Sequence, residues 1–298
     1  MAQITLLDGG MGQELVHRAG DNPTPLWSTQ VMIEHPGLVE AVHKDYFEAG
    51  ATIATTNTYA IHHDRLIRAG IDDQFETLQM AALNEARRAR TAFGSGRVAG
   101  SIGPLNASYR PDLHPPHDRA VALYAEVAQL QKSVVDLIIC ETVASVAHAR
   151  AVLEGAKTAG CPVWLALTLD DEDGHRLRSG ESVADAMAVA ESEGADAILA
   201  NCSIPEVMAA ALDVFATGKL PFGAYANGFT HIASKFLETA PTVDALSARK
   251  DLGPVEYTEF ALGWVNQGAT IVGGCCEVGP SHIAALNQAL MAAGHEIV

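Results

Sequence analysis

Short apolar runs rich in β-branched residues recur along the chain, and longer stretches with helical periodicity separate them. The pattern predicts eight strands, over Ile4–Asp8, Thr52–Thr56, Arg97–Ile102, Asp136–Cys140, Val163–Thr168, Ala197–Asn201, Phe222–Asn227 and Thr270–Gly273. It predicts helices over Gly37–Ala49, Gln74–Phe93, Asp118–Lys132, Val143–Ala159, Val183–Glu193, Pro205–Ala216, Val255–Gln267 and Pro280–Ala293.

This alternation of strand and helix over 298 residues predicts an α/β fold, a (β/α)8 TIM barrel built as a single domain over residues 1–298. Glycines such as Gly160 and Gly194 follow predicted helices, where left-handed backbone is common. A doubly wound sheet is the alternative. It usually carries a phosphate loop, but Gly9-Gly10-Met11-Gly12 does not complete G-x-G-x-x-G.

The predicted strands end in small and polar residues. Active sites of such barrels lie at these carboxyl ends, so the bias predicts a pocket there. The longer loop Asn106–Pro116 follows the third strand at the same end, and we expect it to help cover the site. The strand-end segments are Asp8–Gly10, Thr55–Tyr59, Gly100–Pro104, Cys140–Thr142, Asn201–Cys202, Asn227–Gly228 and Gly273–Cys276.

Three of the five cysteines stand at these ends: Cys202, Cys275 and Cys276. Zinc prefers four ligands, and three protein thiolates would leave one position for a substrate. The alternatives are ordinary buried cysteines or a disulfide between the adjacent pair. Cys140 and Cys161 have no such neighbours, and we expect them to be core or surface residues.

Other polar residues at the strand ends allow two interpretations each. Glu141 follows a buried strand, where a carboxylate needs a partner; it would pair with an arginine or anchor a substrate ammonium group. Asp8 would cap the following turn or bind the same group. Asn227 would cap a turn before Gly228 or offer its amide oxygen to a metal.

Several other chemistries lack their motifs. No H-E-x-x-H or G-x-S-x-G is present. The acidic run Asp170–Asp173 fails the register of a calcium loop, so we expect a solvated loop. The histidines of the predicted loops are expected to be exposed or to make loop contacts; they are His62, His63, His114 and His117.

Composition and charge limit the classes of partner that this chain is expected to bind. The formal charge of −17 disfavours nucleic acid and anionic membranes, and no apolar run reaches the about 20 residues of a membrane span. An odd number of cysteines and no signal-like N-terminus indicate a reducing compartment, so we expect a cytoplasmic protein without a disulfide scaffold. Small-molecule substrates and a monomer or small homo-oligomer are expected.

The motifs together resemble those of the homocysteine S-methyltransferase family, nearly end to end. Asp8-Gly9-Gly10-Met11-Gly12 resembles its D-G-[AG]-M-G, and Gly100–Pro104 resembles its G-S-[IV]-G-P. Glu141-Thr142 is similar to its E-T pair. The remaining matches are Thr56–Tyr59, Asn201-Cys202 and Gly273-Gly274-Cys275-Cys276, of which the last is the most specific.

The resemblance implies a zinc-dependent methyltransferase of methionine biosynthesis, with zinc on the three strand-end cysteines. It implies that Glu141 holds the homocysteine amino-acid group together with Asp8 and nearby backbone. Asn227 matches a position that can approach zinc when substrate is absent. The expected substrate-binding set is Asp8, Gly9, Gly10, Thr56, Ser101, Glu141 and Asn227, and the expected metal ligands are Cys202, Cys275 and Cys276.

The methyl donor is expected to be S-methylmethionine or S-adenosylmethionine. Betaine-using members have a longer C-terminal region and an aromatic residue where this chain has Ala60. Betaine or another onium donor, selenohomocysteine or another small thiol as acceptor, a corrinoid-fed module and a non-enzymatic zinc- or redox-sensing barrel are the alternatives. Candidates to face a methyl cation are Trp27, Tyr59, Tyr109 and Phe229.

Overall fold

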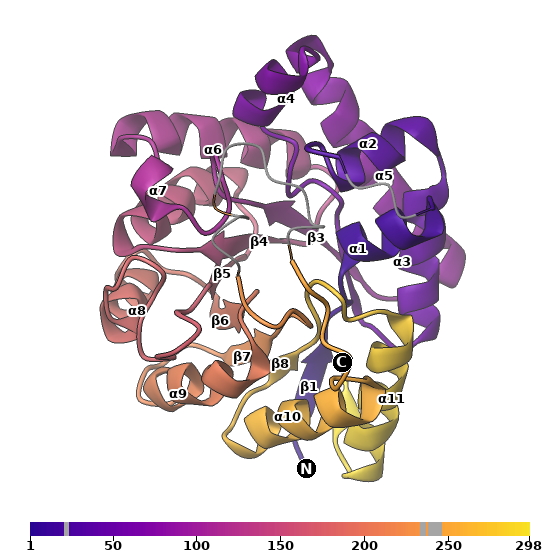
Figure 1. Cartoon of the computed structure of the whole chain (residues 1–298), viewed down its shortest axis with the longest axis vertical. Coiled ribbons are helices and arrows are strands. Elements are labelled where there is room, and N and C mark those ends of the chain that lie inside the picture. Colours follow the sequence, from indigo (N-terminus) through magenta and orange to yellow (C-terminus); the bar gives the residue numbers. More distant parts are fainter. Residues whose placement is uncertain (21–23, 233–236, 238–245) are drawn as a thin grey trace.

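The structure is a computed structural model that describes residues 1–20, 24–232, 237 and 246–298. Parallel strands curl into a barrel, and helices surround it (Figure 1). The strands are β1 (Gln3–Leu6), β2 (Ile53–Thr55), β3 (Arg97–Ile102), β4 (Leu137–Val143), β5 (Val163–Leu167), β6 (Ala197–Asn201), β7 (Phe222–Tyr225), β8 (Ile271–Val272) and β9 (Glu296–Ile297).

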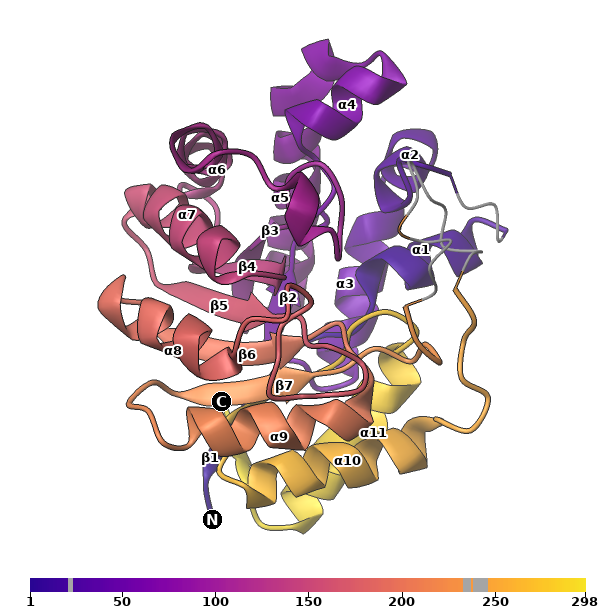
Figure 2. The same ribbon diagram turned by 60° about the vertical axis from the view of Figure 1, so that its left-hand side comes forward.

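The helices that follow the strands confirm the predicted βα alternation, and Figure 2 shows α8, α9 and α10 on the outside of the strands. The α-helices are α1 (Met11–Arg18), α2 (Ser28–Glu34), α3 (Leu38–Glu48), α4 (His63–Ala69), α5 (Phe75–Phe93), α6 (His117–Gln131), α7 (Val146–Ala156), α8 (Val183–Ser192), α9 (Pro205–Phe215), α10 (Pro254–Asn266) and α11 (Pro280–Ala292). Three 3-10 helices are η1 (Asp72–Gln74), η2 (Pro111–Leu113) and η3 (Lys157–Ala159).

The barrel closes between β1 and β2. The strand order is β2-β3-β4-β5-β6-β7-β8-β1-β9, so β2 and β1 must meet to complete the ring. A parallel bridge joins Leu7 to Ile53, and the backbone N–H of Thr52 donates to the carbonyl of Leu6 at 2.7 Å. The ninth strand pairs with the beginning of β1, at Gln3 and Ile4. The predicted (β/α)8 fold is therefore confirmed.

Alternation along the strands builds two apolar layers. In β4, Leu137 and Ile139 belong to the cluster inside the barrel, whereas Ile138 and Cys140 pack toward the helices. Period-two side-chain direction requires this division. Cys140 is fully buried in the outer layer, as expected of a core cysteine, so its thiol points away from the barrel interior.

The strand β4 runs further than its apolar pattern predicts. Its pairing with β5 shifts between Cys140 and Val143, which is the irregularity of a β-bulge. A bulge re-aims side chains next to active sites. Here it turns Glu141 and Thr142 toward the carboxyl end of the barrel, where both line the central cavity.

Candidate active site

A cavity of about 690 Å³ opens at the carboxyl ends of the strands. Residues following almost every strand line it, together with the loop that contains Asn106–Arg110. The expectation that this loop helps to cover the site is consistent with that position. Nine of the residues expected in the site line the cavity: Asp8, Gly9, Gly10, Thr56, Ser101, Glu141, Cys202, Cys275 and Cys276.

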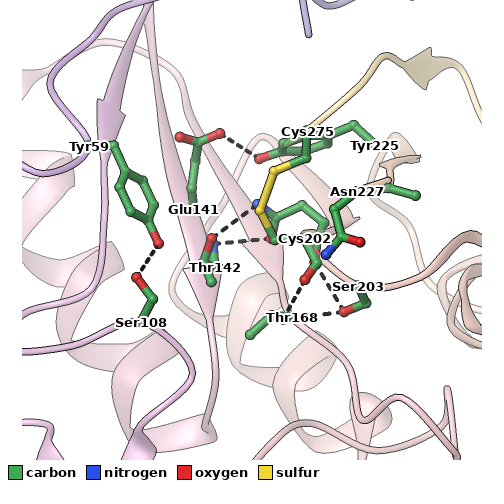
Figure 3. The surroundings of a disulfide bond; sticks show 12 residues. Tyr59, Ser108, Glu141, Thr142, Thr168, Cys202, Ser203, Tyr225, Asn227 and Cys275 are labelled. Carbon is green, nitrogen blue, oxygen red and sulfur yellow. Dashed lines mark hydrogen bonds between the residues drawn. A yellow bond between two sulfur atoms is a disulfide. The ribbon is translucent and has the colours of Figure 1, made fainter. Parts of the chain in front are cut away.

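The three strand-end cysteines come together. One sulfur atom from each of Cys202, Cys275 and Cys276 lies within 4.8 Å of the others. Cys202 follows β6 and is buried, and the adjacent pair follows β8. The structure joins Cys202 to Cys275 as a disulfide, and Cys276 is free (Figure 3). The pairing links two strand ends, whereas the alternative considered from sequence was a bond between neighbours.

Glycine permits the approach of the first loop to the cysteine loop. A Cβ added to Gly10 would lie 2.6 Å from the carbonyl oxygen of Cys275. At Gly9 an added Cβ would clash with the carbonyl oxygen of Val278. Any side chain at these two positions would push the β1–α1 loop off the cysteine loop. Both glycines therefore shape the wall of the site through their missing side chains.

Glu141 is held by two hydroxyl groups. Tyr225 donates to one carboxylate oxygen at 3.0 Å (Figure 3). Ser101 donates to the other at 2.5 Å. Burial raises the pKa of Glu141, and the two hydroxyl hydrogen bonds partly oppose that rise. No arginine pairs with Glu141 among the described residues. The structure therefore leaves this carboxyl available to a cationic group entering the cavity.

Asp8 is tied to the neighbouring strand. Its carboxylate accepts hydrogen bonds from the backbone N–H of Thr55 at 2.6 Å and from the Thr55 hydroxyl at 2.7 Å. Burial raises the pKa of Asp8 to about 8, and the charge of Glu141 contributes to the rise. These contacts differ from the turn cap considered from sequence. Two carboxyl groups whose ionisation is disfavoured by burial share one cavity, which suits an ammonium group.

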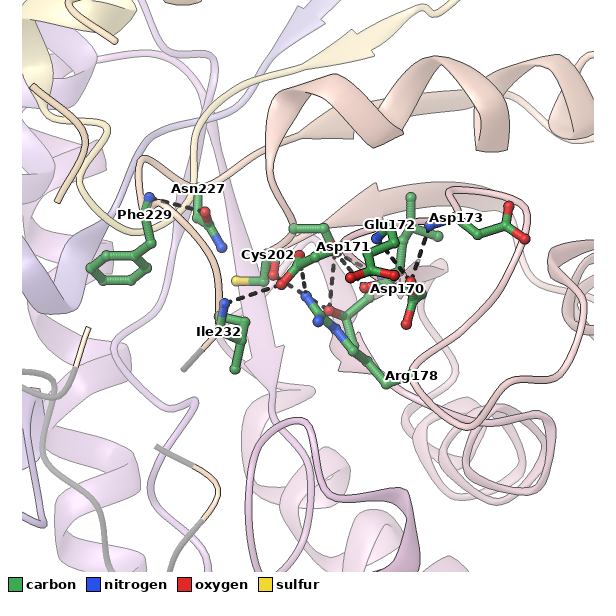
Figure 4. A network of polar contacts seen from close by, with 12 residues as sticks. Asp170, Asp171, Glu172, Asp173, Arg178, Cys202, Asn227, Phe229 and Ile232 are labelled. Carbon is green, nitrogen blue, oxygen red and sulfur yellow. Dashed lines mark hydrogen bonds and ion pairs between the residues drawn. The ribbon is translucent and has the colours of Figure 1, made fainter. Parts of the chain in front are cut away.

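Asn227 lies apart from the cavity lining. Its side-chain oxygen accepts the backbone N–H of Phe229 at 3.1 Å, the arrangement of a turn cap (Figure 4). The amide nitrogen of Asn227 is buried and has no hydrogen-bond partner among the described residues. Thr56 lines the cavity but directs its hydroxyl to Thr58 at 2.8 Å.

Aromatic side chains form one wall of the cavity. The indole of Trp27 meets the ring of Tyr59 edge to face, with centroids 6.2 Å apart. Both residues line the cavity, as do Tyr109 and Phe229, so all four aromatic candidates from the sequence are in place. Tyr225 also lines the cavity and was missed, because inside the strand Phe222–Tyr225 it is indistinguishable from a core aromatic.

The acidic run is more than a solvated loop. Asp171 accepts from the Arg178 guanidinium at 2.6 Å and from the backbone N–H of Ile232 at 3.0 Å (Figure 4). The Arg178 guanidinium also lies 5.5 Å from the ring centre of Tyr109. This network connects three loops around the cavity mouth. The expectation of an entirely solvated run is therefore wrong at Asp171, whose charge is paired.

The histidines expected in loops make local contacts. His63 pairs with Asp72 at 2.6 Å, and His117 pairs with Glu154 at 3.0 Å. His114 stacks on the buried His148, with ring centroids 4.7 Å apart. His62 is not exposed: its side chain is buried. Burial also lowers the pKa of His62.

Left-handed backbone concentrates around the cavity. Six non-glycine residues of the described chain have positive φ, and five of them line the cavity. Thr142 has φ 57° and Cys202 has φ 48°, a conformation that costs such residues energy. The side-chain oxygen of Asn201 accepts the backbone N–H of Thr142 at 3.1 Å and steadies the turn. The five are Trp27, Asn106, Tyr109, Thr142 and Cys202.

Comparison with known proteins shows to which family the chain belongs. The sequence profile described as homocysteine S-methyltransferase matches residues 5–290. The chain belongs to the homocysteine S-methyltransferase family. It is 31% identical to homocysteine S-methyltransferase of Escherichia coli strain K12, over 95% of this chain and 94% of that protein. Family membership makes this protein a methyl-transferring enzyme.

Two solved structures of the homocysteine methyltransferase MmuM from E. coli resemble this chain. The metallated form matches with a TM-score of 0.80 and 29% identity, over 96% of each chain. The oxidised form matches with a TM-score of 0.78, 29% identity and the same coverage. No helix in the described part of our chain is both long and apolar enough to cross a membrane.

Proposed function

We propose that this protein is a zinc-dependent enzyme that moves a methyl group from S-methylmethionine or S-adenosylmethionine to homocysteine, giving methionine. The observation that carries the proposal is the cluster of three cysteine sulfurs within 4.8 Å, in a cavity that also contains Glu141. Family membership supports the methyl transfer, and the sulfur cluster supports the metal.

The residues present fit a zinc ion. Catalytic zinc keeps three protein ligands and leaves a fourth position for substrate, and cysteine thiolates are among the ligands that zinc binds. Cys202 supplies one sulfur from the loop after β6, and Cys275 and Cys276 supply two from the loop after β8. The disulfide between the first two must be reduced before both can act as ligands, which a reducing cytoplasm would ensure. When bound, zinc favours the thiolate form of a coordinated thiol.

The carboxyl groups would hold the acceptor. The homocysteine ammonium group would lie against Glu141, which Ser101 and Tyr225 fix in orientation, with Asp8 nearby. An ammonium lowers the pKa of the carboxyls it contacts, so substrate binding would favour the ionised forms that burial disfavours. This arrangement would point the thiol of the bound amino acid toward the cysteines.

The reaction needs alignment more than acid or base catalysis. The homocysteine thiol releases its proton, and its sulfur attacks the donor methyl carbon in line. A new carbon–sulfur bond forms as the bond from that carbon to the donor sulfonium breaks, and the bonding pair stays on the donor, which leaves as a neutral thioether. The face of Trp27 or Tyr59 would stabilise the sulfonium before transfer. Positioning two reactants in one cavity supplies much of the acceleration.

The test is methyl transfer by the reduced, zinc-loaded protein. Methionine formation from homocysteine should be measured with S-methylmethionine, S-adenosylmethionine and betaine as separate donors. We expect activity with a sulfonium donor and metal near one equivalent, both lost when Cys202, Cys275 and Cys276 are all replaced by serine. Stoichiometric metal in the triple variant, or inactivity of the loaded protein with every donor, would overturn the proposal.

The same assay separates the remaining alternatives. Activity with betaine alone would change the donor but keep the site, and activity only after adding a methylated corrinoid protein would indicate a corrinoid-fed module. The disulfide is the observation closest to a redox-sensing barrel. A sensor has no use for an amine anchor, so replacing Glu141 by alanine should impair only an enzyme.

A further inference from the structure

Arg65 of α4 lines the cavity with an incompletely paired guanidinium group. Its Nη2 donates to the carbonyl oxygen of Pro104 at 3.3 Å and to the hydroxyl of Ser108 at 3.5 Å. Both acceptors are neutral, and both distances are long for hydrogen bonds of this type. The Nε atom of Arg65 is buried and has no partner among the described residues. A guanidinium carries five N–H donors, so most of its capacity is unused.

This arginine differs from most others in the chain. The chain has 36 acidic and 19 basic residues, so carboxylate partners are abundant. No ion pair involves Arg65 within the described ranges of the chain. A partly buried cation without an anion is costly unless a ligand supplies one. The arginines that do pair with carboxylates are Arg18, Arg88, Arg90, Arg110, Arg150, Arg176, Arg178 and Arg249.

The aromatic wall of the cavity places the Arg65 guanidinium next to the region where the methyl donor is proposed to bind. The Arg65 guanidinium carbon lies 5.6 Å from the ring centre of Tyr59. The hydroxyl groups of Tyr59 and Ser108 are 2.8 Å apart, so Ser108 contacts both residues. The Tyr59 ring in turn meets Trp27 edge to face. The rings of Trp27 and Tyr59 suit an onium methyl group, and the guanidinium of Arg65 lies beside them as a positive charge.

We propose that Arg65 binds the carboxylate of the methyl donor and so selects donors that are sulfonium amino acids. The inference rests on the proposed function and adds the substrate class that the cavity prefers. A carboxylate accepts two parallel N–H bonds from one guanidinium, which fixes the donor's orientation as well as its affinity. The sulfonium would then lie against Trp27 and Tyr59, with its methyl group facing the acceptor sulfur.

The test compares S-methylmethionine with its carboxamide, which keeps the sulfonium and lacks the negative charge. In the wild-type enzyme the carboxamide should have a KM about ten- to a hundredfold higher. The Arg65→Met variant should raise the KM of S-methylmethionine by a similar factor and leave that of the carboxamide unchanged. The KM of homocysteine and the metal content should stay at their wild-type values, and Arg65→Lys should recover part of the lost affinity.

The control is Arg87→Met, which removes an exposed arginine on α5 whose guanidinium contacts Asn84. It should behave as wild type, and thermal melting should show that Arg65→Met is folded. An unchanged preference for the carboxylate in folded Arg65→Met would overturn the inference. Calorimetric titration of both compounds into metal-free, reduced protein gives the same comparison without turnover. It therefore decides the role of Arg65 even if no donor supports catalysis, which would be the failure of the proposed function instead.

Discussion

The side-chain amide of Gln13 donates a hydrogen bond of 2.6 Å to Glu277, the residue that directly follows Cys276. The amide oxygen of the same Gln13 accepts the indole N–H of Trp27 at 2.9 Å. One buried glutamine therefore connects the cysteine loop with the aromatic wall of the cavity. Glu277 has φ 65°, a backbone conformation that this hydrogen bond helps to hold.

Replacing Gln13 by leucine should loosen the cysteine loop. The variant loses a hydrogen bond to a charged group, which is worth about 1.5–3 kcal/mol. We expect a lower melting temperature and metal affinity weaker by at least about tenfold, measured by competition with a chromophoric chelator. Gln13→Glu is the companion variant, and like charges beside Glu277 should weaken metal binding further. Wild-type affinity in both variants would show that the loop holds its shape alone.

The two hydroxyls on Glu141 should matter less than the carboxylate itself. Glu141→Gln removes the charge expected to meet the substrate ammonium, so the KM of homocysteine should rise by about a hundredfold. Tyr225→Phe removes one neutral donor and should cost about 0.5–1.5 kcal/mol, which is about two- to twelvefold in KM. Steady-state kinetics at saturating donor give both values. A larger loss from Tyr225→Phe than from Glu141→Gln would contradict the assigned roles.

Asp8 should make the protein less stable as the pH rises. Its pKa in the folded protein is about 8, against a reference value of 3.8. Between these values the folded state keeps a proton that the unfolded state has released, so raising the pH favours unfolding. Relative to Asp8→Asn, the wild-type free energy of unfolding should fall by up to ~1.4 kcal/mol per pH unit in this window.

Urea denaturation of the reduced, metal-free proteins at several pH values between 4 and 8 measures the difference. Asparagine keeps the shape and an oxygen that accepts from the backbone of Thr55, so the comparison isolates the charge. Parallel stability curves for wild type and variant would mean that Asp8 is already ionised in the free protein.

Gly12 should tolerate no larger residue. A Cβ at this position would overlap the six-membered ring of the Trp27 indole, so Gly12→Ala must displace that ring. We expect a loss of about 1–3 kcal/mol in unfolding free energy and a change in tryptophan fluorescence. Gly263→Ala in α10 is the matched control, since nothing lies within 4 Å of its added Cβ. It should stabilise the protein by about 0.5–1 kcal/mol, because alanine is a better helix former.

The repeated alternation of strand and helix patterns predicted the barrel and the order of its strands and helices along the chain. Both signals, period-two burial in the strands and helical periodicity between them, are local. The helices α1, α2 and α4 were missed. They lie within the βα loops after β1 and β2, where short helices follow no barrel repeat. The final strand β9 was missed for a related reason. Its two residues, Glu296 and Ile297, pair with β1 across the length of the chain, and only the closed barrel brings them there.

The strand-end cysteines could be predicted because thiols are rare and their common position was visible. The partners of Glu141 could not, since Ser101 and Tyr225 are 40 and 84 positions away from it. Such contacts depend on which strands become neighbours and on the bulge in β4. Gln13 and Arg65 carried no motif at all; their significance appears only from the atoms around them.

The left-handed residues around the cavity bear on how this enzyme could be engineered. Glycine at Thr142 or Cys202 would relieve an unfavourable conformation and stabilise the isolated chain, yet it would remove a side chain from the cavity proposed as the active site. A screen for thermal stability alone would therefore favour glycine at these positions and would select against activity. Stabilising substitutions are better sought on the outer helices, far from the mouth of the barrel.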